Sequence, residues 1–284
     1  VNIDEVSNVS KYIKNYIISN NSLPDYVTIN GNKVDMANLA YILATSFKMI
    51  DSNLYANIPL NNFKYSDTIE ENLTHYIINS DSYLTIANNL INYMDKNNAL
   101  PSYLNTESGK IRYESIILLF ATIFNYLNDN GEFLESTTII PWNSVQSYKF
   151  FNIDDITTAS QYLKEYIELN HKLPNTIQIN GSNISIISYA QLASETILNI
   201  NGDLYSLLIA KNFNEDLSDL NNESNNVENN NNLELNTPQM IYSHEYIYLI
   251  NQLNEYFNNN PQYKSISSFN YDFNNAYIDL NNIY

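Results

Sequence analysis

The stretch that decides the fold is residues 14–44, KNYIISNNSLPDYVTINGNKVDMANLAYILA. Its first part continues an apolar pattern at three- and four-residue spacing, which predicts an amphipathic helix over residues 4–19 with Asp4 as its N-cap. Leu23-Pro24 then forces an extended exit from the helix, and residues 26–29 predict a short strand. The first half of the stretch therefore predicts a helix followed by a strand.

The second half of the stretch predicts a turn, a returning strand and another helix. Asn30-Gly31 supplies the turn, because glycine tolerates the positive φ of a tight hairpin, and Lys33-Val34 begins the return. From Met36 onward the apolar residues again follow a helical spacing. The whole unit is a helix, a β-hairpin and a helix, about 50 residues long.

This unit recurs along the chain. Asn2-Ile3-Asp4 reappears 150 positions later as Asn152-Ile153-Asp154, and the same shift aligns Leu23-Pro24 with Leu173-Pro174. A shift of 77 positions gives a weaker match, in which Leu100-Pro101 repeats Leu23-Pro24. Repeated supersecondary units are typical of arrays that build long binding surfaces.

We therefore predict a mainly helical α+β protein of tandem helix–β-hairpin–helix repeats arranged as two paired-repeat domains. Residues 1–145 hold repeats one and two, and residues 146–284 hold repeats three and four. The fourth repeat is degenerate, because residues 246–257 predict its first helix but no hairpin follows. An acidic, asparagine-rich insert at about residues 212–238 has too few apolar groups to offset its ordering entropy, which predicts disorder.

The charge and the apolar runs restrict the partners. Acidic residues number 31 and basic residues 13, and the resulting net charge of -18 disfavours nucleic acid and anionic membranes. The longest apolar run, residues 116–124, is far shorter than the ~20 residues of a membrane span, so we expect a buried helix there and no span in this segment. The chain contains no cysteine, which excludes disulfides and thiolate metal sites. It begins at Val1 without a methionine or a leader, and we expect it to be a piece of a longer protein.

The sequence offers little for catalysis. His75, His171 and His244 are far apart and lack the spacing that aims two metal ligands from one helix face. The acid pairs Asp4-Glu5 and Asp154-Asp155 recur at predicted helix starts, where carboxylates complement the helix dipole. We therefore predict no enzymatic activity, no cofactor and no metal site. A glycan-cleaving enzyme remains a minor alternative, because glycosidases use two carboxylates at a set separation.

Tyrosine is the best candidate for ligand recognition, because its ring offers a flat apolar face and a hydroxyl group. Tyr26 and Tyr103 follow a proline at a loop-to-strand junction, where binding residues collect on a rigid scaffold, so we predict that both contact ligand. Asn30, in the first turn, and Tyr263, in the fourth exit, complete the candidate ligand-binding set. The tyrosines on the apolar helix faces are predicted to be core residues: Tyr12, Tyr16, Tyr162 and Tyr166.

A second set of residues is predicted to serve the scaffold. The Leu-Pro steps fix the exit of the chain from each first helix, and the glycines serve the hairpin turns. These structural residues are Leu23, Pro24, Gly31, Leu100, Pro101, Leu173, Pro174 and Gly181.

The Leu-Pro-x-Tyr exit, the Asn-Gly turn and the amphipathic helix of residues 14–44 together resemble the pseudomurein-binding repeat of methanogenic archaea. The second unit, with GKIRYES at residues 109–115, an apolar helix and then residues 128–131, is similar to the companion form that occurs in tandem in such proteins. The resemblance covers about 200 of the 284 residues. Thr176 departs from the pattern where the first two units have tyrosine.

The resemblance implies a non-catalytic module that binds pseudomurein or another cell-wall polymer, in an extracellular, wall-associated archaeal surface protein. Family members occur in adhesin-like proteins and attached to cysteine endoisopeptidases, and a chain without cysteine cannot contain that catalytic domain. Several weak repeats would combine by avidity. The alternative from another class is a protein–protein adhesion segment that binds host or bacterial surface proteins. The degenerate fourth unit and Thr176 favour this alternative for the second half.

Overall fold

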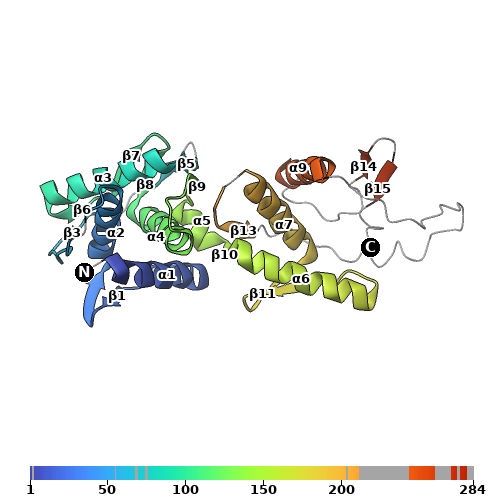
Figure 1. Cartoon of the computed structure of the whole chain (residues 1–284), viewed down its shortest axis with the longest axis horizontal. Coiled ribbons are helices and arrows are strands. Elements are labelled where there is room, and N and C mark those ends of the chain that lie inside the picture. Colours follow the sequence, from blue (N-terminus) through green and yellow to red (C-terminus); the bar gives the residue numbers. More distant parts are fainter. Residues whose placement is uncertain are drawn as a thin grey trace, which may run out of the picture. The chain divides into compact units, whose positions relative to one another are not determined.

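The computed structural model describes residues 1, 3–54, 56–67, 70–73, 76–202, 204–210, 243–259, 270–273 and 276–279 (Figure 1). Over these residues the protein is 56% helical, with eight helices and small sheets, so the prediction of a mainly helical α+β protein is confirmed. None of these helices is long and apolar enough to cross a membrane. The predicted disordered insert, about residues 212–238, lies outside the described residues.

The chain divides into two compact units. Unit 1 comprises Val1–Phe150 and Asp203–Leu207, and unit 2 comprises Phe151–Gly202 and Leu208–Tyr284. The sequence predicts a boundary between two domains at residues 145 and 146, and this domain division remains a prediction.

The first segment, residues 3–51, contains the predicted helix, hairpin and helix. These are α1 (Ile3–Asn20), β1 (Tyr26–Ile29), β2 (Asn32–Asp35) and α2 (Met36–Asp51). Helix α1 starts at Ile3, so Asp4 lies inside the helix and the prediction of Asp4 as its N-cap is wrong. Asp35 caps α2 instead, with its carboxylate accepting from the backbone N–H of Asn38 at 2.8 Å.

Two further segments have the same order of elements. Residues 80–130 contain α3 (Ser80–Asn97), β7 (Tyr103–Thr106), β8 (Gly109–Arg112) and α4 (Tyr113–Asn130). Residues 153–201 contain α6 (Ile153–Asn170), β11 (Thr176–Ile179), β12 (Ser182–Ser185) and α7 (Ile186–Asn201). The three hairpins also share one register, since in each case the first residue of the first strand pairs with the last residue of the second strand.

The first helix of each segment ends in the same way. Asn21, Asn98 and His171 have φ of 54°, 49° and 52°, and each donates its backbone N–H at 2.8 Å to the carbonyl four residues earlier. The asparagine before each of them, Asn20, Asn97 or Asn170, donates its side-chain amide at 2.8 Å to a tyrosine carbonyl of the last turn. These bonds satisfy carbonyls that a helix end leaves free, and the Leu-Pro step that follows prevents continuation.

The fourth segment corrects the prediction that no hairpin follows its first helix. Helix α9 (Ser243–Asn259) is followed by β14 (Asn270–Phe273) and β15 (Ala276–Asp279), which pair antiparallel from Asn270↔Asp279 to Phe273↔Ala276. The sequence pattern does not predict this hairpin because its first strand lies farther from the preceding proline than in the first segment. Pro261 precedes Asn270 by nine positions, whereas Pro24 precedes Tyr26 by two, and the turn contains no glycine.

Short strands join the loops of unit 1, and local sequence patterns did not predict them. Strand β3 (Lys64–Tyr65) pairs with β6 (Ala99–Leu100), β4 (Asn72–Leu73) with β8, and β5 (Ile77–Asn79) with β9 (Ser136–Thr138). The remaining elements are α5 (Trp142–Ser147), β10 (Lys149–Phe151) and β13 (Leu208–Ala210). The strand pairs bring together residues far apart in the sequence, and β4 in particular braces the second hairpin.

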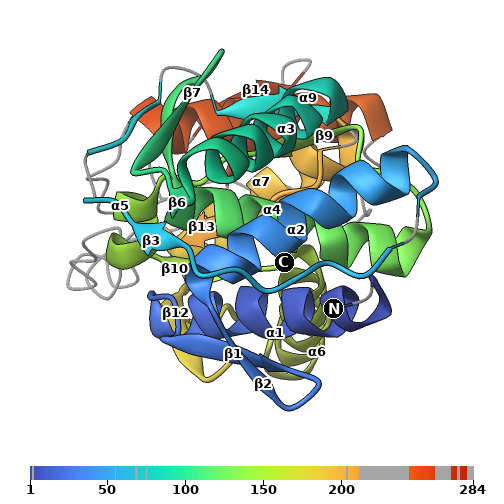
Figure 2. The ribbon, with the colours of Figure 1, turned by 90° about the vertical axis from the view of Figure 1, so that its left-hand side faces the viewer.

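The core of unit 1 lies between helices of different segments. Helix α1 packs on α4, and α2 packs on α3 and α4 (Figure 2). Phe47 of α2 is fully buried, and its ring centroid lies 4.3 Å from that of Phe124 and 5.1 Å from that of Phe120, both on α4. Tyr83 of α3 lies 6.1 Å away on the same cluster and donates its hydroxyl to the Leu134 carbonyl at 2.7 Å. Neither segment closes an apolar core by itself.

The core of unit 2 is smaller among the described residues. Its main cluster combines Ile156 and Ala159 of α6, the inward residues of the β11–β12 hairpin, and Tyr189 and Leu192 of α7. Leu208 and Ala210 of β13 complete it. Helix α6 buries only those two residues, and α7 packs on both α6 and α9.

Substitution of Gly109 tests whether the pairing of β4 with β8 stabilises the second hairpin. The φ of Gly109 is +108°, and a Cβ atom would lie 2.0 Å from the Asn72 carbonyl oxygen of β4. We expect Gly109→Ala to lower the free energy of unfolding by about 2–4 kcal/mol, because backbone strain and a backbone clash add. Gly31→Ala, at φ +75° with nothing within 4 Å, should cost only about 1–2 kcal/mol. Urea unfolding of both variants is the measurement, and equal losses would show that β4 does not constrain the hairpin.

Tyr41 predicts how stability changes at alkaline pH. Its hydroxyl on α2 donates to Asp95 of α3 at 2.8 Å, and burial, then the hydrogen bond and the negative charge of Asp95, raise the pKa of Tyr41 to about 12. The unfolded chain releases this proton near pH 10, so the folded state retains the proton at higher pH. The stability contributed by this group is therefore present below pH 10 and lost as the pH rises to about 12. Urea unfolding at several pH values should show a shallower alkaline decline for Tyr41→Phe, and an unchanged slope would contradict this role.

Candidate functional site

The two tyrosines predicted to contact ligand lie at matching places on the hairpins of unit 1. Tyr26 is the first residue of β1 and pairs with Asp35, and Tyr103 is the first residue of β7 and pairs with Arg112. In β1 the side chains alternate, with Val27 buried toward the core and Tyr26 44% exposed on the outer face. Tyr103 is half-buried at the same position of its hairpin.

A lysine lies over each of these tyrosine rings. The Nζ of Lys33 is 4.1 Å from the ring centroid of Tyr26, and the Nζ of Lys110 is 4.7 Å from that of Tyr103. Each lysine is on the returning strand, diagonally across from its tyrosine, so the two side chains share the outer face. Within the described part of the chain, neither lysine forms a salt bridge. We call each combination a tyrosine–lysine pair.

Sequence reasoning missed the lysines because their contact depends on strand register. The signal was present, since lysine follows the tyrosine by seven positions in both hairpins. The third hairpin has lost both members together, with Thr176 and Asn183 at the matching positions. The tyrosine–lysine pair is thus shared by the two hairpins of unit 1 and absent from β11–β12.

Lys110 keeps its positive charge available although another cation lies nearby. Arg112, opposite Tyr103, is bound by Glu114, which accepts from Nε at 3.1 Å and also from the guanidinium Nη2. This hydrogen bond is the main cause that raises the pKa of Arg112. The charge of Arg112 is therefore compensated within the protein, whereas the Lys110 ammonium lies over the Tyr103 ring and forms no salt bridge among the described residues.

An open groove adjoins the first tyrosine–lysine pair. Its volume is about 600 Å³, and it lies between α1 and β1, where Tyr12, Pro24 and Tyr26 line it with Asn8 and Thr28. We call it the α1 groove. It places two tyrosine side chains and several polar side chains along one concave surface, which can offer ring faces and hydrogen-bonding groups to a ligand.

The α1 groove corrects one sequence prediction. Tyr12 is 52% exposed and Tyr162 57% exposed, so the prediction that they are core residues is wrong. The core stripe of α1 consists of Val6, Ile13 and Ile17, and the tyrosine next to it points outward. Tyr16 and Tyr166 are half-buried.

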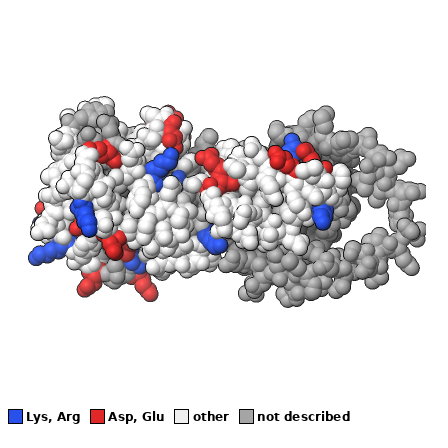
Figure 3. Space-filling model, turned by 90° about the horizontal axis from the view of Figure 1, so that it is seen from below, with Lys and Arg blue, Asp and Glu red and all other residues white. Residues whose placement is uncertain are grey.

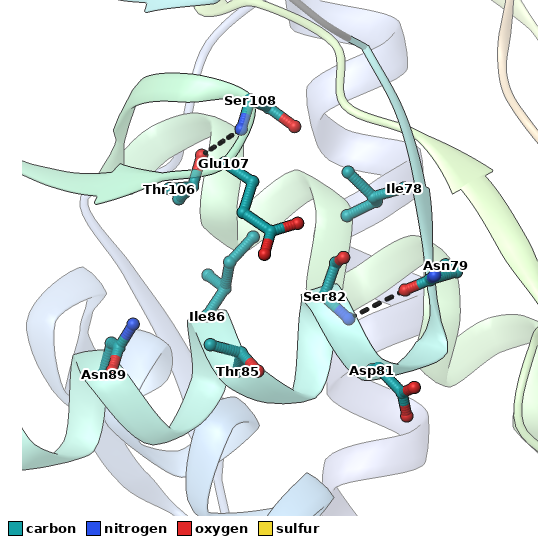
Figure 4. Close-up of a pocket in the computed structure, with 10 residues that line it drawn as sticks. All are labelled: Ile78, Asn79, Asp81, Ser82, Thr85, Ile86, Asn89, Thr106, Glu107 and Ser108. Carbon is teal, nitrogen blue, oxygen red and sulfur yellow. Dashed lines mark hydrogen bonds between the residues drawn. The ribbon is translucent and has the colours of Figure 1, made fainter.

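A second groove lies on α3, at the matching helix residues of the second segment but at the tip of the hairpin rather than at its start. Its volume is about 250 Å³, and Thr85, Ile86 and Asn89 of α3 line it together with the hairpin tip, Glu107 and Ser108 (Figure 4). We call it the α3 groove. A shift of 77 positions relates its three helix residues to Asn8, Val9 and Tyr12 of the α1 groove. Both grooves therefore adjoin the same part of the first helix.

The other two residues predicted to bind ligand are Asn30 and Tyr263. Asn30 has φ +51°, and its side-chain amide donates to the Glu5 carboxylate, which ties the hairpin tip to α1. This contact gives Asn30 a scaffold role. Tyr263 lies outside the described residues.

The predicted structural residues are present at the exits and turns, with different degrees of burial. Pro24 and Pro101 are buried and Leu100 is 1% exposed, whereas Leu23 and Pro174 are half-buried and Leu173 is 45% exposed. Gly31 and Gly181 have φ of 75° and 74° in matching two-residue turns. The Leu-Pro exit therefore belongs to the core in unit 1 more than in unit 2.

The described residues contain no group of three or more His, Cys, Asp or Glu side chains that could hold a metal ion. The acid pair at the start of α6 has a structural explanation, because Asp155 accepts the backbone N–H of Asn152 at 2.8 Å. His171 forms the C-cap of α6. His75 and the side chain of His244 lie outside the described residues.

No protein-family model matches this chain, and no curated protein is similar enough to count as a match. The geometry of the hairpins and grooves, and the chemistry of the residues that form them, are therefore the basis for a functional proposal.

Proposed function

We propose that this chain is a non-catalytic cell-wall-binding module of an archaeal surface or exported protein, and that it binds pseudomurein. In this proposal the helix–hairpin–helix segments are tandem repeats arranged as two paired-repeat domains. The observation that carries the proposal is the duplicated tyrosine–lysine pair, of which the first copy borders the α1 groove through Tyr26. The resemblance of residues 14–44 to the pseudomurein-binding repeat supports the choice of polymer.

The chemistry of the pairs suits a wall polymer. A tyrosine ring packs against the apolar face of a sugar, and its hydroxyl and a neighbouring ammonium group supply hydrogen bonds to glycan or peptide oxygens. Uncharged side chains cover most of the described surface on the face seen in Figure 3, where acidic and basic groups are scattered. A largely uncharged surface favours a neutral polymer over a polyanion.

The packing of unit 1 supports binding through two sites at once. The helix contacts between the first two segments hold both hairpins in one compact unit, so engagement of one hairpin raises the local concentration of polymer at the other. Two individually weak sites on one body can gain about 10²–10⁴ in combined affinity. A repeating polymer presents the many equivalent groups that such binding requires.

For unit 2, a specific observation favours protein–protein adhesion as a second candidate. The third hairpin lacks the tyrosine–lysine pair, and large apolar side chains are exposed on or just after α6: Tyr162, Leu169 and Leu173. Leu169 is 80% exposed, a position that water disfavours and a protein partner would cover. The partners in this alternative are host or bacterial surface proteins.

Sedimentation with purified pseudomurein sacculi at moderate salt tests the proposal. We expect the parent chain to sediment, and Tyr26→Ala with Tyr103→Ala to weaken binding by roughly 1–3 kcal/mol, the usual cost of losing aromatic anchors. The melting temperature should change little, because Tyr26 is 44% exposed. The matched control is Tyr162→Ala, which removes an exposed tyrosine from the third segment and should bind like the parent.

Three results would contradict parts of the proposal. A parent chain that stays in the supernatant would rule out wall binding. A double variant that binds like the parent would rule out the hairpin tyrosines as the site. Binding to intact partner cells without binding to sacculi would select the adhesion alternative.

A further inference from the structure

The α3 groove is bordered by one exposed carboxylate at the tip of the second hairpin. Glu107, at the tip of the second hairpin, extends its side chain into the space between Ile78, Ile86 and Ser82 (Figure 4). Within the described part of the chain, its carboxylate forms no hydrogen bond and no ion pair. The apolar part of the lining comes from Ile78 and Ile86, which are 5% and 2% exposed. The rest of the lining is polar: Asn79, Asp81, Ser82, Thr85, Asn89, Thr106 and Ser108.

The backbone that carries Glu107 is held firmly. Thr106 Oγ1 accepts the backbone N–H of Ser108 at 3.1 Å and donates to the Gly109 carbonyl at 2.8 Å, which closes the turn. Strand β4 pairs with β8 on the far side of the same tip, from Leu73↔Gly109 to Asn72↔Lys110. The carboxylate is therefore presented by a braced turn rather than by a loose loop.

The first hairpin has a different contact at the matching position. A shift of 77 positions relates Glu107 to Asn30 and Ser82 to Glu5. In the first segment the Asn30 amide donates to the Glu5 carboxylate, so the protein itself supplies an N–H donor to the acid. In the second segment the acid is Glu107, at the tip of the hairpin, and the matching helix residue is Ser82. The carboxylate of Glu107 is exposed, and no N–H donor of the described residues contacts it.

Asp81 is the other acid at the α3 groove, and it has a structural role. It lies in the first turn of α3, where a negative charge complements the helix dipole. Its carboxylate points away from the groove in Figure 4. Asn79 caps the same helix by accepting the backbone N–H of Ser82 at 2.9 Å. The helix end therefore accounts for Asp81 and leaves Glu107 as the charge that faces the groove.

We propose that the α3 groove is a subsite for a primary ammonium group at the end of an alkyl chain, as in a lysine side chain. The methylene groups pack between Ile78 and Ile86, and the ammonium donates to Glu107. A volume of about 250 Å³ admits such a chain. The net charge of -18 raises the local concentration of cations. This inference rests on the proposed function only for its natural source, an amino-bearing peptide side chain of the wall polymer.

Nuclear magnetic resonance titration of the full chain with Nα-acetyl-lysine methylamide tests the subsite. We expect saturable amide shifts at Glu107, Ser108 and Asn89, and none with Nα-acetyl-norleucine methylamide, which has the alkyl chain without the ammonium. Glu107→Gln should weaken lysine binding about tenfold or more, because it removes a charge-assisted hydrogen bond but keeps the shape. Asp81→Asn is the matched control. It removes the same charge at the same groove, and its affinity should stay within about twofold of the parent's.

Two outcomes would overturn the inference: no saturable shifts at the groove, or equal losses in Glu107→Gln and Asp81→Asn, which would indicate a diffuse field effect. Sacculus sedimentation separates this inference from the proposed function. A chain that sediments but does not bind the lysine probe contradicts the subsite alone. A chain that binds the probe but does not sediment contradicts the wall-binding function alone.

Discussion

The structure of unit 1 depends on the burial of Phe47 between helices of two segments. Phe47 comes from α2, and the rings near it come from α3, from α4 and, with Phe133, from the chain just after α4. The cluster therefore exists only when the first two segments are folded together. Truncating a buried aromatic residue of this kind typically costs about 3–5 kcal/mol, a large share of the stability of a domain. The same packing fixes where the hairpins emerge from the unit. The placement of the two hairpins is therefore a consequence of the core.

Each local element of the first segment was predictable because its signal is local. The Leu-Pro step ends the first helix, the Asn-Gly pair sets the turn, and the apolar spacing marks the second helix. The sequence does not predict features that depend on contacts between residues far apart in the chain. Strand β4 exists because β8 lies beside it, and the lysines meet the tyrosine rings because of strand register. Helical spacing predicts a core position for Tyr12 because it marks an apolar stripe without giving its width, whereas the side chain is 52% exposed.

The residues of the candidate site also divide into those that local sequence signals predict and those that only the folded chain brings together. Tyr26 and Tyr103 were identified from their place after a proline, and the structure locates them on matching outer faces. Glu107 was not identified, because only the folded chain shows that the tip of the second hairpin faces α3. The first two hairpins thus share a tyrosine–lysine pair but differ at the tip, where an amide–carboxylate contact in one corresponds to an open groove in the other. In the proposed function, this difference would let the two hairpins contact different groups of one polymer.

Hydrogen–deuterium exchange of the full chain, with and without solubilised pseudomurein fragments, tests most directly whether the hairpins of unit 1 form the binding surface. The account predicts that polymer slows exchange in residues 24–35 and 101–112, which contain the two tyrosine–lysine pairs, and leaves the third hairpin, residues 174–185, unchanged. Slower exchange confined to the third hairpin, or no change in either hairpin of unit 1 at saturating polymer, would contradict the account.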